Sequence, residues 1–284
     1  MKLCGVVITY YPDIKETANN ILRYIDDVDH LIIWENTPIE VRNQYRISLP
    51  EYNYKLSYLG IDCNMGIAYP LNRSIEWAKE NGYTHILTMD QDSQWQNFKL
   101  YRQEIEKCSD ETVGMFTPSI YNVDNVQLEL LPPITSGSVH PISIFTKTGL
   151  FCEDYFIDCI DHEFYYRILL NSLSVRYIPG AHLNHSLGYK QTKRFLNLSF
   201  KTTYYSPFRL YHMLRNNIWL YYKYQHCSVL PKGYAKYIAS ELIIKQVVKI
   251  ILAEDDKANK VKALLKGLLD GIKSKRRFNY HSQL

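Results

Sequence analysis

The fold is decided by the stretch ILTMDQDS at residues 86–93. Its apolar first half predicts a buried strand, and two carboxylates, Asp90 and Asp92, follow directly. Alternate side chains of an extended segment point the same way, so both carboxylates can face one ligand. Two anions this close repel, and a hard divalent cation with phosphates among its other ligands relieves that repulsion. The alternative explanation of the pair is a polar turn after a strand.

The sequence before this stretch predicts an alternation of strands and helices. Strands are expected at residues 3–9, 30–34 and 55–59, and a fourth at 84–89. An amphipathic helix follows the first strand, and a second helix, with Pro70 in its first turn, precedes the fourth. This alternation predicts an α/β fold with a parallel sheet and helices on both faces.

Polar or small residues follow each of the four predicted strands. These strand ends contain Thr9-Tyr10, Glu35-Asn36, Asn64 to Gly66, and the two aspartates. In open α/β sheets, ligands bind in the crevice outside the carboxyl ends of the strands. The four strand ends together therefore predict a nucleotide site along one edge of the sheet.

The pattern changes after residue 93. A helix is expected at 96–108, strands at 113–120, 138–145 and 174–178, and a helix at 161–171. Helices dominate from residue 206 onward. We therefore predict a catalytic domain at 1–205, with a nucleotide-binding half at 1–93 and an acceptor-binding half at 94–205, followed by a helical region at 206–284.

Composition limits the class of protein. The chain has 284 residues, is 46% hydrophobic, and contains no run of eighteen apolar residues that predicts a spanning helix. Its start is too short and lacks the cleavage site of a signal peptide. Six scattered cysteines without a CxxC pair favour a cytoplasmic protein with reduced thiols over a zinc or disulfide framework.

Charge is concentrated near the carboxyl terminus. Residues 257–277 carry eight Lys or Arg and one Asp, a local charge of +7; taking this from the chain's net +4 leaves −3 elsewhere. An apolar stripe at helical spacing runs through the same segment. A cationic amphipathic helix of this kind can lie on an anionic membrane, so we predict a peripheral contact at its inner face. A helix packed on the body, or a homodimer contact, is the alternative.

The sequence resembles glycosyltransferase family 2, whose members invert configuration on a GT-A fold, and within it the bacterial rhamnosyltransferase group. The resemblance spans roughly residues 3–220, and each motif is modest alone, whereas their order and spacing are specific. The matching segments are residues 7–12, 35–37, 64–68, Asn72, 90–93, 135–137, 156–164 with Arg167, 185–188, 204–211 and 215–217.

The resemblance implies a set of donor-binding residues. The turn after the first strand holds the nucleotide, and the acidic residue after the second, here Glu35 where Asp is usual, contacts the base. A glycine at position 66 permits close backbone approach. Asp90 would lie beside the ribose. The donor-binding residues implied in this way are Thr9, Tyr10, Tyr11, Glu35, Asn36, Asn64, Gly66, Ile67, Asn72, Asp90, Gln91 and Gly137.

The resemblance also implies which residues act on the acceptor. Asp161 is the expected catalytic base, with an N-cap role as the alternative. The family's first acid is missing at position 160, and Asp158 precedes it instead, so we predict that Asp158 and Glu163 contact the acceptor. An ion pair between Glu163 and Arg167, four residues apart on a helix, is the competing explanation for Glu163.

The implied cofactor is Mg²⁺ or Mn²⁺, held by Asp92 and by His185, with His182 as the competing histidine. The implied donor is a nucleotide-diphosphate sugar, and the resemblance favours dTDP-L-rhamnose. The implied acceptor is a lipid-linked saccharide of a surface polysaccharide such as O-antigen or capsule. UDP-galactose, UDP-galactofuranose and UDP-glucose remain open as donors.

Two other classes compete with the glycosyltransferase. A nucleotidyltransferase should carry a Gly-rich basic loop after the first strand, which residues 10–13 lack. A non-catalytic carbohydrate-binding protein would not need carboxylates and histidine to converge. No GxGxxG follows the first strand, and no basic, aromatic-interleaved surface indicates nucleic acid.

Overall fold

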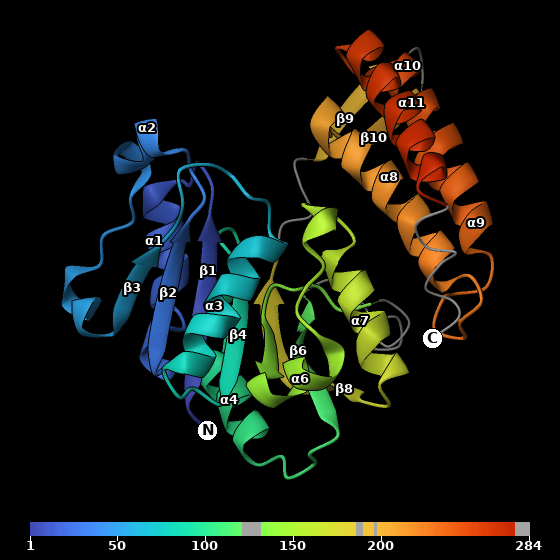
Figure 1. Cartoon of the computed structure of the whole chain (residues 1–284). Coiled ribbons are helices and arrows are strands. Elements are labelled where there is room, and N and C mark those ends of the chain that lie inside the picture. Colours follow the sequence, from blue (N-terminus) through green and yellow to red (C-terminus); the bar gives the residue numbers. More distant parts are fainter. Residues whose placement is uncertain (121–131, 186–189, 196–197, 276–284) are drawn as a thin grey trace. The chain divides into compact units, whose positions relative to one another are not determined.

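The computed structural model describes residues 1–120, 132–185, 190–195 and 198–275. The chain divides into two compact units (Figure 1), one of Met1–Phe156 with Ile160–Ser186, and one of Ile157–Cys159 with Leu187–Leu284. Each unit is described by itself. The predicted domain boundary at residue 205 and the division of the catalytic domain at residue 93 stay predictions.

The first unit is built on one mixed sheet in the order β3-β2-β1-β4-β7-β6-β8-β5. Its first four strands pair in parallel, as predicted, whereas β7 runs antiparallel to both β4 and β6. The strands are β1 (Leu3–Thr9), β2 (His30–Glu35), β3 (Leu56–Leu59), β4 (His85–Asp90), β5 (Gln94–Trp95), β6 (Val113–Ile120), β7 (Ser138–Pro141) and β8 (Ser174–Asn184).

Helices cover both faces of the parallel part of the sheet. The helices of this unit are α1 (Ile14–Leu22), α2 (Ile39–Arg42), α3 (Ala68–Glu80), α4 (Phe98–Glu106), α6 (Phe145–Thr148) and α7 (Ile160–Leu170). On one face of the sheet, Val7 and Met89 belong to a buried hydrophobic cluster that also contains Ile21 of α1 and Phe98 of α4. Helix α3 contacts β1 and β4 and buries its own apolar face. Every residue of β1 is buried, as expected for a parallel strand covered on both sides.

The order of the strands locates a switch point. From β1 the chain moves to β2 and β3 on one side, and α3 then returns it to β4 on the other side of β1. In open α/β sheets, ligands bind at such a switch point, outside the carboxyl ends of the strands. Tyr10 and Asp92 follow those two strands.

Two predicted strands have different limits in the structure. The strand expected at 138–145 ends at Pro141, and Ile142–Ile144 form a 3₁₀ turn leading into α6. Pro141 has no backbone N–H to extend the ladder. The strand expected at 174–178 instead continues to Asn184, because Pro179-Gly180 lie in a bulge. Gly180 has a φ of +77°, which few other residues adopt.

The second unit is largely helical in its described part. It contains the hairpin β9 (Lys190–Phe195) and β10 (Leu198–Thr203), and the helices α8 (Pro207–Tyr224), α9 (Tyr234–Tyr237), α10 (Lys245–Ala253) and α11 (Lys257–Lys273), with a π-helical segment at Ile238–Ile244. No helix among the described residues is long and apolar enough to span a membrane.

Helix α11 packs along α8 (Figure 1). The close approach depends on glycine, because a Cβ on Gly267 would lie 2.7 Å from the Tyr211 carbonyl oxygen. Of the apolar stripe expected here, Leu264 is buried, whereas Leu265, Leu269 and Ile272 are exposed. The buried face of α11 is therefore formed by small residues as well as apolar ones. Residues 276–277 of the predicted basic segment lie outside the described residues.

Candidate active site

Three predicted ligands come together beyond β4. Asp90, Asp92 and His185 each place one ligand atom within 4.8 Å of the others. Asp92 is exposed, while the other two are half-buried. The His185 Nδ1 atom lies 3.9 Å from the Asp92 Oδ1 atom. This cluster belongs entirely to the first unit.

Strand register brings His185 to the aspartates. β5 pairs antiparallel with β8, with Gln94 opposite Asn184, so Ser93 and His185 come next in register. Their Oγ and Nδ1 atoms are 2.9 Å apart. The competing His182 pairs with Ser119 of β6 and is not part of the cluster found among the described residues. The rest of the motif that follows His185, at 186–188, lies outside the described residues.

The donor set of this cluster fits a divalent cation. Two carboxylates supply the hard oxygen ligands that Mg²⁺ and Mn²⁺ prefer. An imidazole is a softer ligand, which suits Mn²⁺ better than Mg²⁺. Two carboxylates beside each other at a sheet edge repel, and a cation between them offsets that repulsion.

Gln91 connects the two strands that flank the crevice. Its Oε1 accepts from the Tyr10 backbone N–H at 2.7 Å, and its Nε2 donates to the Tyr10 carbonyl at 3.2 Å. The side chain thus binds the first-strand turn, and its predicted contact with the sugar stays a prediction. Tyr11 has a φ of 44° and donates its backbone N–H to Thr37 at 2.9 Å. Tyr10 and Tyr11 remain exposed beside the crevice.

Glu35 is a buried carboxylate at the end of β2. Burial raises the pKa of Glu35 above its ordinary value, an effect that Arg46 and Arg42 oppose. Among the described residues its Oε1 atom has no hydrogen-bond partner, although the Arg46 Nε atom lies 3.8 Å away. A buried acceptor of this kind is uncommon in native proteins. Thr9, its partner in register, donates its hydroxyl to the Trp34 carbonyl at 3.2 Å.

Asn36 organises the loop after β3. Its amide donates to the Asn64 Oδ1 atom and to the Gly66 carbonyl, both at 2.8 Å, and accepts from the Met65 N–H at 3.1 Å. Asn64 in turn accepts from the Gly66 N–H at 2.8 Å. The predicted nucleotide loop is therefore held by a network of its own polar residues.

The backbone conformation and close packing at position 66 require glycine. With a φ of +75°, it would place a Cβ only 2.2 Å from the Phe156 carbonyl oxygen. The next residue, Ile67, donates its N–H to the same carbonyl at 2.8 Å. The resemblance attributes the missing side chain at position 66 to the approach of a nucleotide. The segment that leads to α7 needs the same space.

Asn72 binds another part of that segment. Its amide donates to the Phe151 carbonyl at 2.9 Å and to the Glu153 carboxylate at 2.7 Å, and it accepts from the Phe151 N–H at 2.9 Å. Asn72 is buried, so the structure gives it a role in holding residues 151–153. The predicted donor contact of Asn72 stays a prediction.

Asp161 lies in the first turn of α7 and is half-buried. Its Oδ1 atom accepts the His162 backbone N–H at 2.9 Å. A helix amino terminus stabilises a carboxylate in its ionised form. The role of Asp161 as the general base stays a prediction.

Glu163 is wholly buried and forms an ion pair, at 2.7 Å, with Arg167 one turn along α7. Arg167 also donates to the Thr148 carbonyl at 2.6 Å. The ion-pair explanation is the one the structure supports. An acceptor contact by Glu163 would require this buried pair to open, which costs several kcal/mol, on the order of 3–5.

Asp158 belongs to the second unit. Its Oδ1 atom accepts from Arg209 at 3.2 Å, and its carbonyl accepts from the Asn216 amide at 3.0 Å. Phe156, Asp158 and Cys159 all have positive φ angles, a conformation that is costly for residues other than glycine. The backbone before Asp161 is therefore strained.

Sequence reasoning missed the two serines beneath the cluster. Ser93 and Ser136 are fully buried, and the Ser136 hydroxyl donates to Ser93 at 2.7 Å. Gly137, predicted to contact the donor, has a φ of +82° and lies where a Cβ would be 2.7 Å from Leu183. Both serines stand within motifs of the sequence, but their pairing depends on contacts between segments over forty residues apart.

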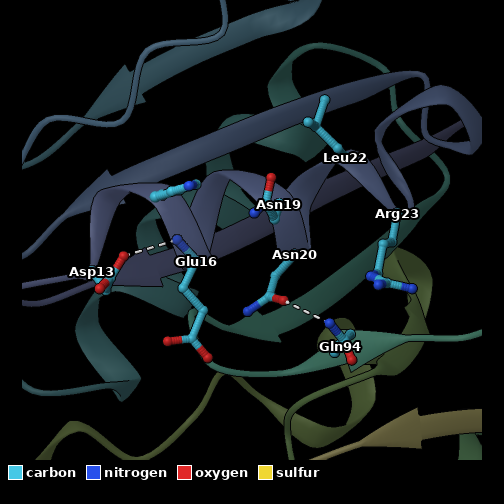
Figure 2. A pocket seen from close by; sticks show the side chains of 8 residues that line it. Asp13, Glu16, Asn19, Asn20, Leu22, Arg23 and Gln94 are labelled. Atoms are coloured by element: carbon cyan, nitrogen blue, oxygen red, sulfur yellow. Dashed lines mark hydrogen bonds between the residues drawn. The ribbon is translucent and has the colours of Figure 1, made fainter.

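The surface hollow drawn in Figure 2 lies elsewhere, against α1. It is lined by Asp13, Lys15, Glu16, Asn19, Asn20, Leu22, Arg23 and Gln94. Asn20 donates its amide to the Gln91 carbonyl at 3.1 Å and accepts from the Gln94 amide at 3.5 Å. Its mixed charges show no convergent site.

Known proteins resemble this chain along most of its length. No protein-family model matches. The dTDP-rhamnosyl transferase RfbF of Shigella flexneri is 24% identical over 300 residues, covering 95% of each chain. Among solved structures, the mannosyltransferase PcManGT from Pyrobaculum calidifontis, in complex with GDP-Man and Mn²⁺, has a TM-score of 0.60 at 11% identity, covering 97% of this chain and 87% of its own.

A second solved structure, S. aureus TarS 1–349 with UDP-GlcNAc, has a TM-score of 0.55 at 13% identity, covering 98% of this chain and 84% of its own. The expected GT-A fold is confirmed. The expected resemblance to rhamnosyltransferases is confirmed by the curated relative, and so is the expected enzyme class, a glycosyltransferase.

Replacing Gly66 by Ala should destabilise the protein far more than the positive φ angle alone would, because the new Cβ also clashes with Phe156. Gly82 is the matched control, since its φ of +71° is similar but nothing lies within 4 Å of a Cβ placed there. We expect Gly82→Ala to cost about 1 kcal/mol and Gly66→Ala at least about 2 kcal/mol more, measured by urea unfolding. Equal costs would show that the contact with Phe156 is not a constraint.

Proposed function

We propose that this glycosyltransferase moves L-rhamnose from dTDP-L-rhamnose to a lipid-linked saccharide during the synthesis of a surface polysaccharide. The observation that carries the proposal is the cluster of Asp90, Asp92 and His185 beyond β4, in the crevice beside β1. The name of the curated relative from Shigella flexneri supports the choice of donor. UDP-galactose, UDP-galactofuranose and UDP-glucose are the competing donors.

Glu35 supports a pyrimidine nucleotide. Thymine and uracil carry an imide N–H, and the unsatisfied Oε1 atom of Glu35 is an acceptor at the end of the neighbouring strand. Hydrogen bonding to that donor would relieve the cost of burying the carboxylate. Tyr10 and Tyr11, exposed at the end of β1, offer flat faces next to the same site.

Asp92 and His185 would hold the Mg²⁺ or Mn²⁺ ion, with Asp90 beside it and the ribose. Such an ion acts as a Lewis acid that stabilises the negative charge on a leaving diphosphate. The solved PcManGT structure, which contains Mn²⁺ with GDP-Man, supports this assignment. The imidazole in the cluster favours Mn²⁺ of the two ions.

Asp161 would act as the general base. Its carboxylate takes the proton of the acceptor hydroxyl while that oxygen attacks the anomeric carbon from the face opposite the diphosphate. The bond from the anomeric carbon to the diphosphate breaks as the new bond forms, so the configuration inverts. A direct displacement needs no nucleophilic side chain.

The membrane contact is proposed for one face of α11. Lys260 does not belong to it, because it is buried and pairs with Glu254 at 2.7 Å. The opposite face exposes Leu265, Leu269 and Ile272, which are 56%, 56% and 47% exposed. Lys262, Lys266 and Lys273 lie exposed beside them. Apolar side chains flanked by lysines fit an anionic lipid surface, which supports a peripheral contact of a cytoplasmic enzyme with the inner face of the membrane.

The donor and the metal can be tested together. Purified protein should hydrolyse or transfer from dTDP-L-rhamnose faster than from the three UDP-sugars, EDTA should stop turnover, and Mn²⁺ or Mg²⁺ should restore it. Asp92→Ala should lose the metal-dependent rise in melting temperature with dTDP. Preference for a UDP-sugar would replace the donor, and full activity in EDTA would remove the metal from the proposal.

Replacing Asp161 by Asn should reduce kcat by about 10²- to 10⁴-fold, because the amide cannot accept the proton. Binding of dTDP, measured by calorimetry, should be unchanged. Asp110→Asn, at an exposed loop of the same unit, serves as the control and should be fully active. Near-normal turnover of the Asp161 variant would exclude it as the base.

The membrane face is tested by vesicle flotation. The double variant Leu265→Ser/Leu269→Ser should lose most of its binding to vesicles containing phosphatidylglycerol, and Lys262→Glu/Lys266→Glu should lose it more at low than at high salt. Leu100→Ser/Leu170→Ser, at exposed positions of the first unit, is the control. If the α11 variants change only the sedimentation of a dimer, this face is a contact between copies.

A further inference from the structure

A chain of buried hydrogen bonds runs beneath the three clustered residues. The Asp90 backbone N–H donates to the Ser136 hydroxyl at 3.1 Å, and that hydroxyl donates to the Ser93 hydroxyl at 2.7 Å. The Ser93 oxygen lies 2.9 Å from the His185 Nδ1 atom. The chain thus joins the backbone of one cluster member to the side chain of another.

Ser136 is held in place from both sides. Its neighbour Gly137 donates an N–H to the Thr88 carbonyl at 2.7 Å, and the Thr88 hydroxyl donates to the Ser138 carbonyl at 3.2 Å. A side chain at Gly137 would collide with Leu183, two residues before His185. The turn that carries Ser136 is therefore packed directly against both β4 and the end of β8.

Neither serine has access to water, since both are fully buried. A serine hydroxyl has one proton to donate and two lone pairs that accept. Ser136 uses its proton on Ser93 and accepts from Asp90, while Ser93 accepts from Ser136 and contacts His185. A buried hydroxyl cannot exchange these partners for water, so each position constrains the next.

We propose that Ser93 and Ser136 are positioning residues for the cation site. Ser93 orients the His185 imidazole, and Ser136 fixes both Ser93 and the backbone of Asp90. Metal-binding histidines generally use one ring nitrogen for the ion and place the other on a hydrogen-bond partner. Ser93 contacts the Nδ1 atom of His185, which would leave the Nε2 atom for the ion. This inference rests on the proposed role of Asp92 and His185 in metal binding.

The test measures Mn²⁺ affinity by electron paramagnetic resonance, in the presence of dTDP and separately of UDP, and needs no turnover. Loss of such a partner commonly weakens metal binding 10- to 100-fold, so we expect a decrease of about 10-fold or more for Ser93→Ala and for Ser136→Ala. Ser74→Ala removes an equally buried hydroxyl from α3 and should leave the affinity unchanged.

A double-mutant cycle separates positioning from general destabilisation. If Ser93 acts through His185, Ser93→Ala should have no further effect on Mn²⁺ affinity in a His185→Ala protein. Ser93→Ala and Ser136→Ala should also be less than additive when combined. Additive losses, or a loss of the same size for Ser74→Ala, would overturn the proposal.

The outcomes also distinguish this inference from the proposed function. If Asp92→Ala and His185→Ala weaken Mn²⁺ binding while both serine variants bind normally, the positioning role is wrong and the metal site stands. If Asp92→Ala binds Mn²⁺ as tightly as the unaltered protein, the metal site itself is wrong, and the serine proposal is wrong with it. Circular dichroism of each variant confirms that it is folded, and Ser93→Cys provides a second variant close in size.

Discussion

The structure of the candidate site depends on one constraint, the parallel pairing of β1 with both β2 and β4. The chain leaves β1 toward β2 and comes back to β4 on the opposite side, and open α/β sheets bind ligands at the carboxyl ends of strands at such a switch point. Polar residues at those ends can then face a ligand. Gln91, bound to both backbone groups of Tyr10, holds the two strand ends together.

The polar residues around the crevice are divided between holding the chain and remaining available to a ligand. Asn36, Asn72 and Gln91 use their amides on backbone groups of neighbouring segments. Asp92 is exposed, and Glu35 keeps an unsatisfied buried oxygen among the described residues. Amides suit the first task because each has both donors and acceptors, whereas carboxylates suit cations and N–H donors. This division explains how one group of polar residues can both hold the loops in place and leave carboxylates for a ligand.

Local sequence pattern predicted most of the first unit. The strands Leu3–Thr9 and Val113–Ile120 have the expected limits, because apolar runs flanked by turn residues are local signals. The pattern failed at Pro179-Gly180, where a bulge continues the strand that these residues were expected to end. Glu163 and Arg167 illustrate the same limit, since helical spacing allows an ion pair but only the tertiary structure shows that the pair is buried.

The sequence by itself determined the alternation of strands and helices and the positions of the acidic residues, because these follow from local periodicity. The class of enzyme came from the resemblance of its motifs, read in order, to a known family. The tertiary structure decided which histidine joins the aspartates, since that depends on the antiparallel register of β5 with β8. It also decided that Gly66 must accommodate Phe156, and that two buried serines connect Asp90 with His185. Contacts between segments distant in the chain set these distances, and no local pattern of residues encodes them.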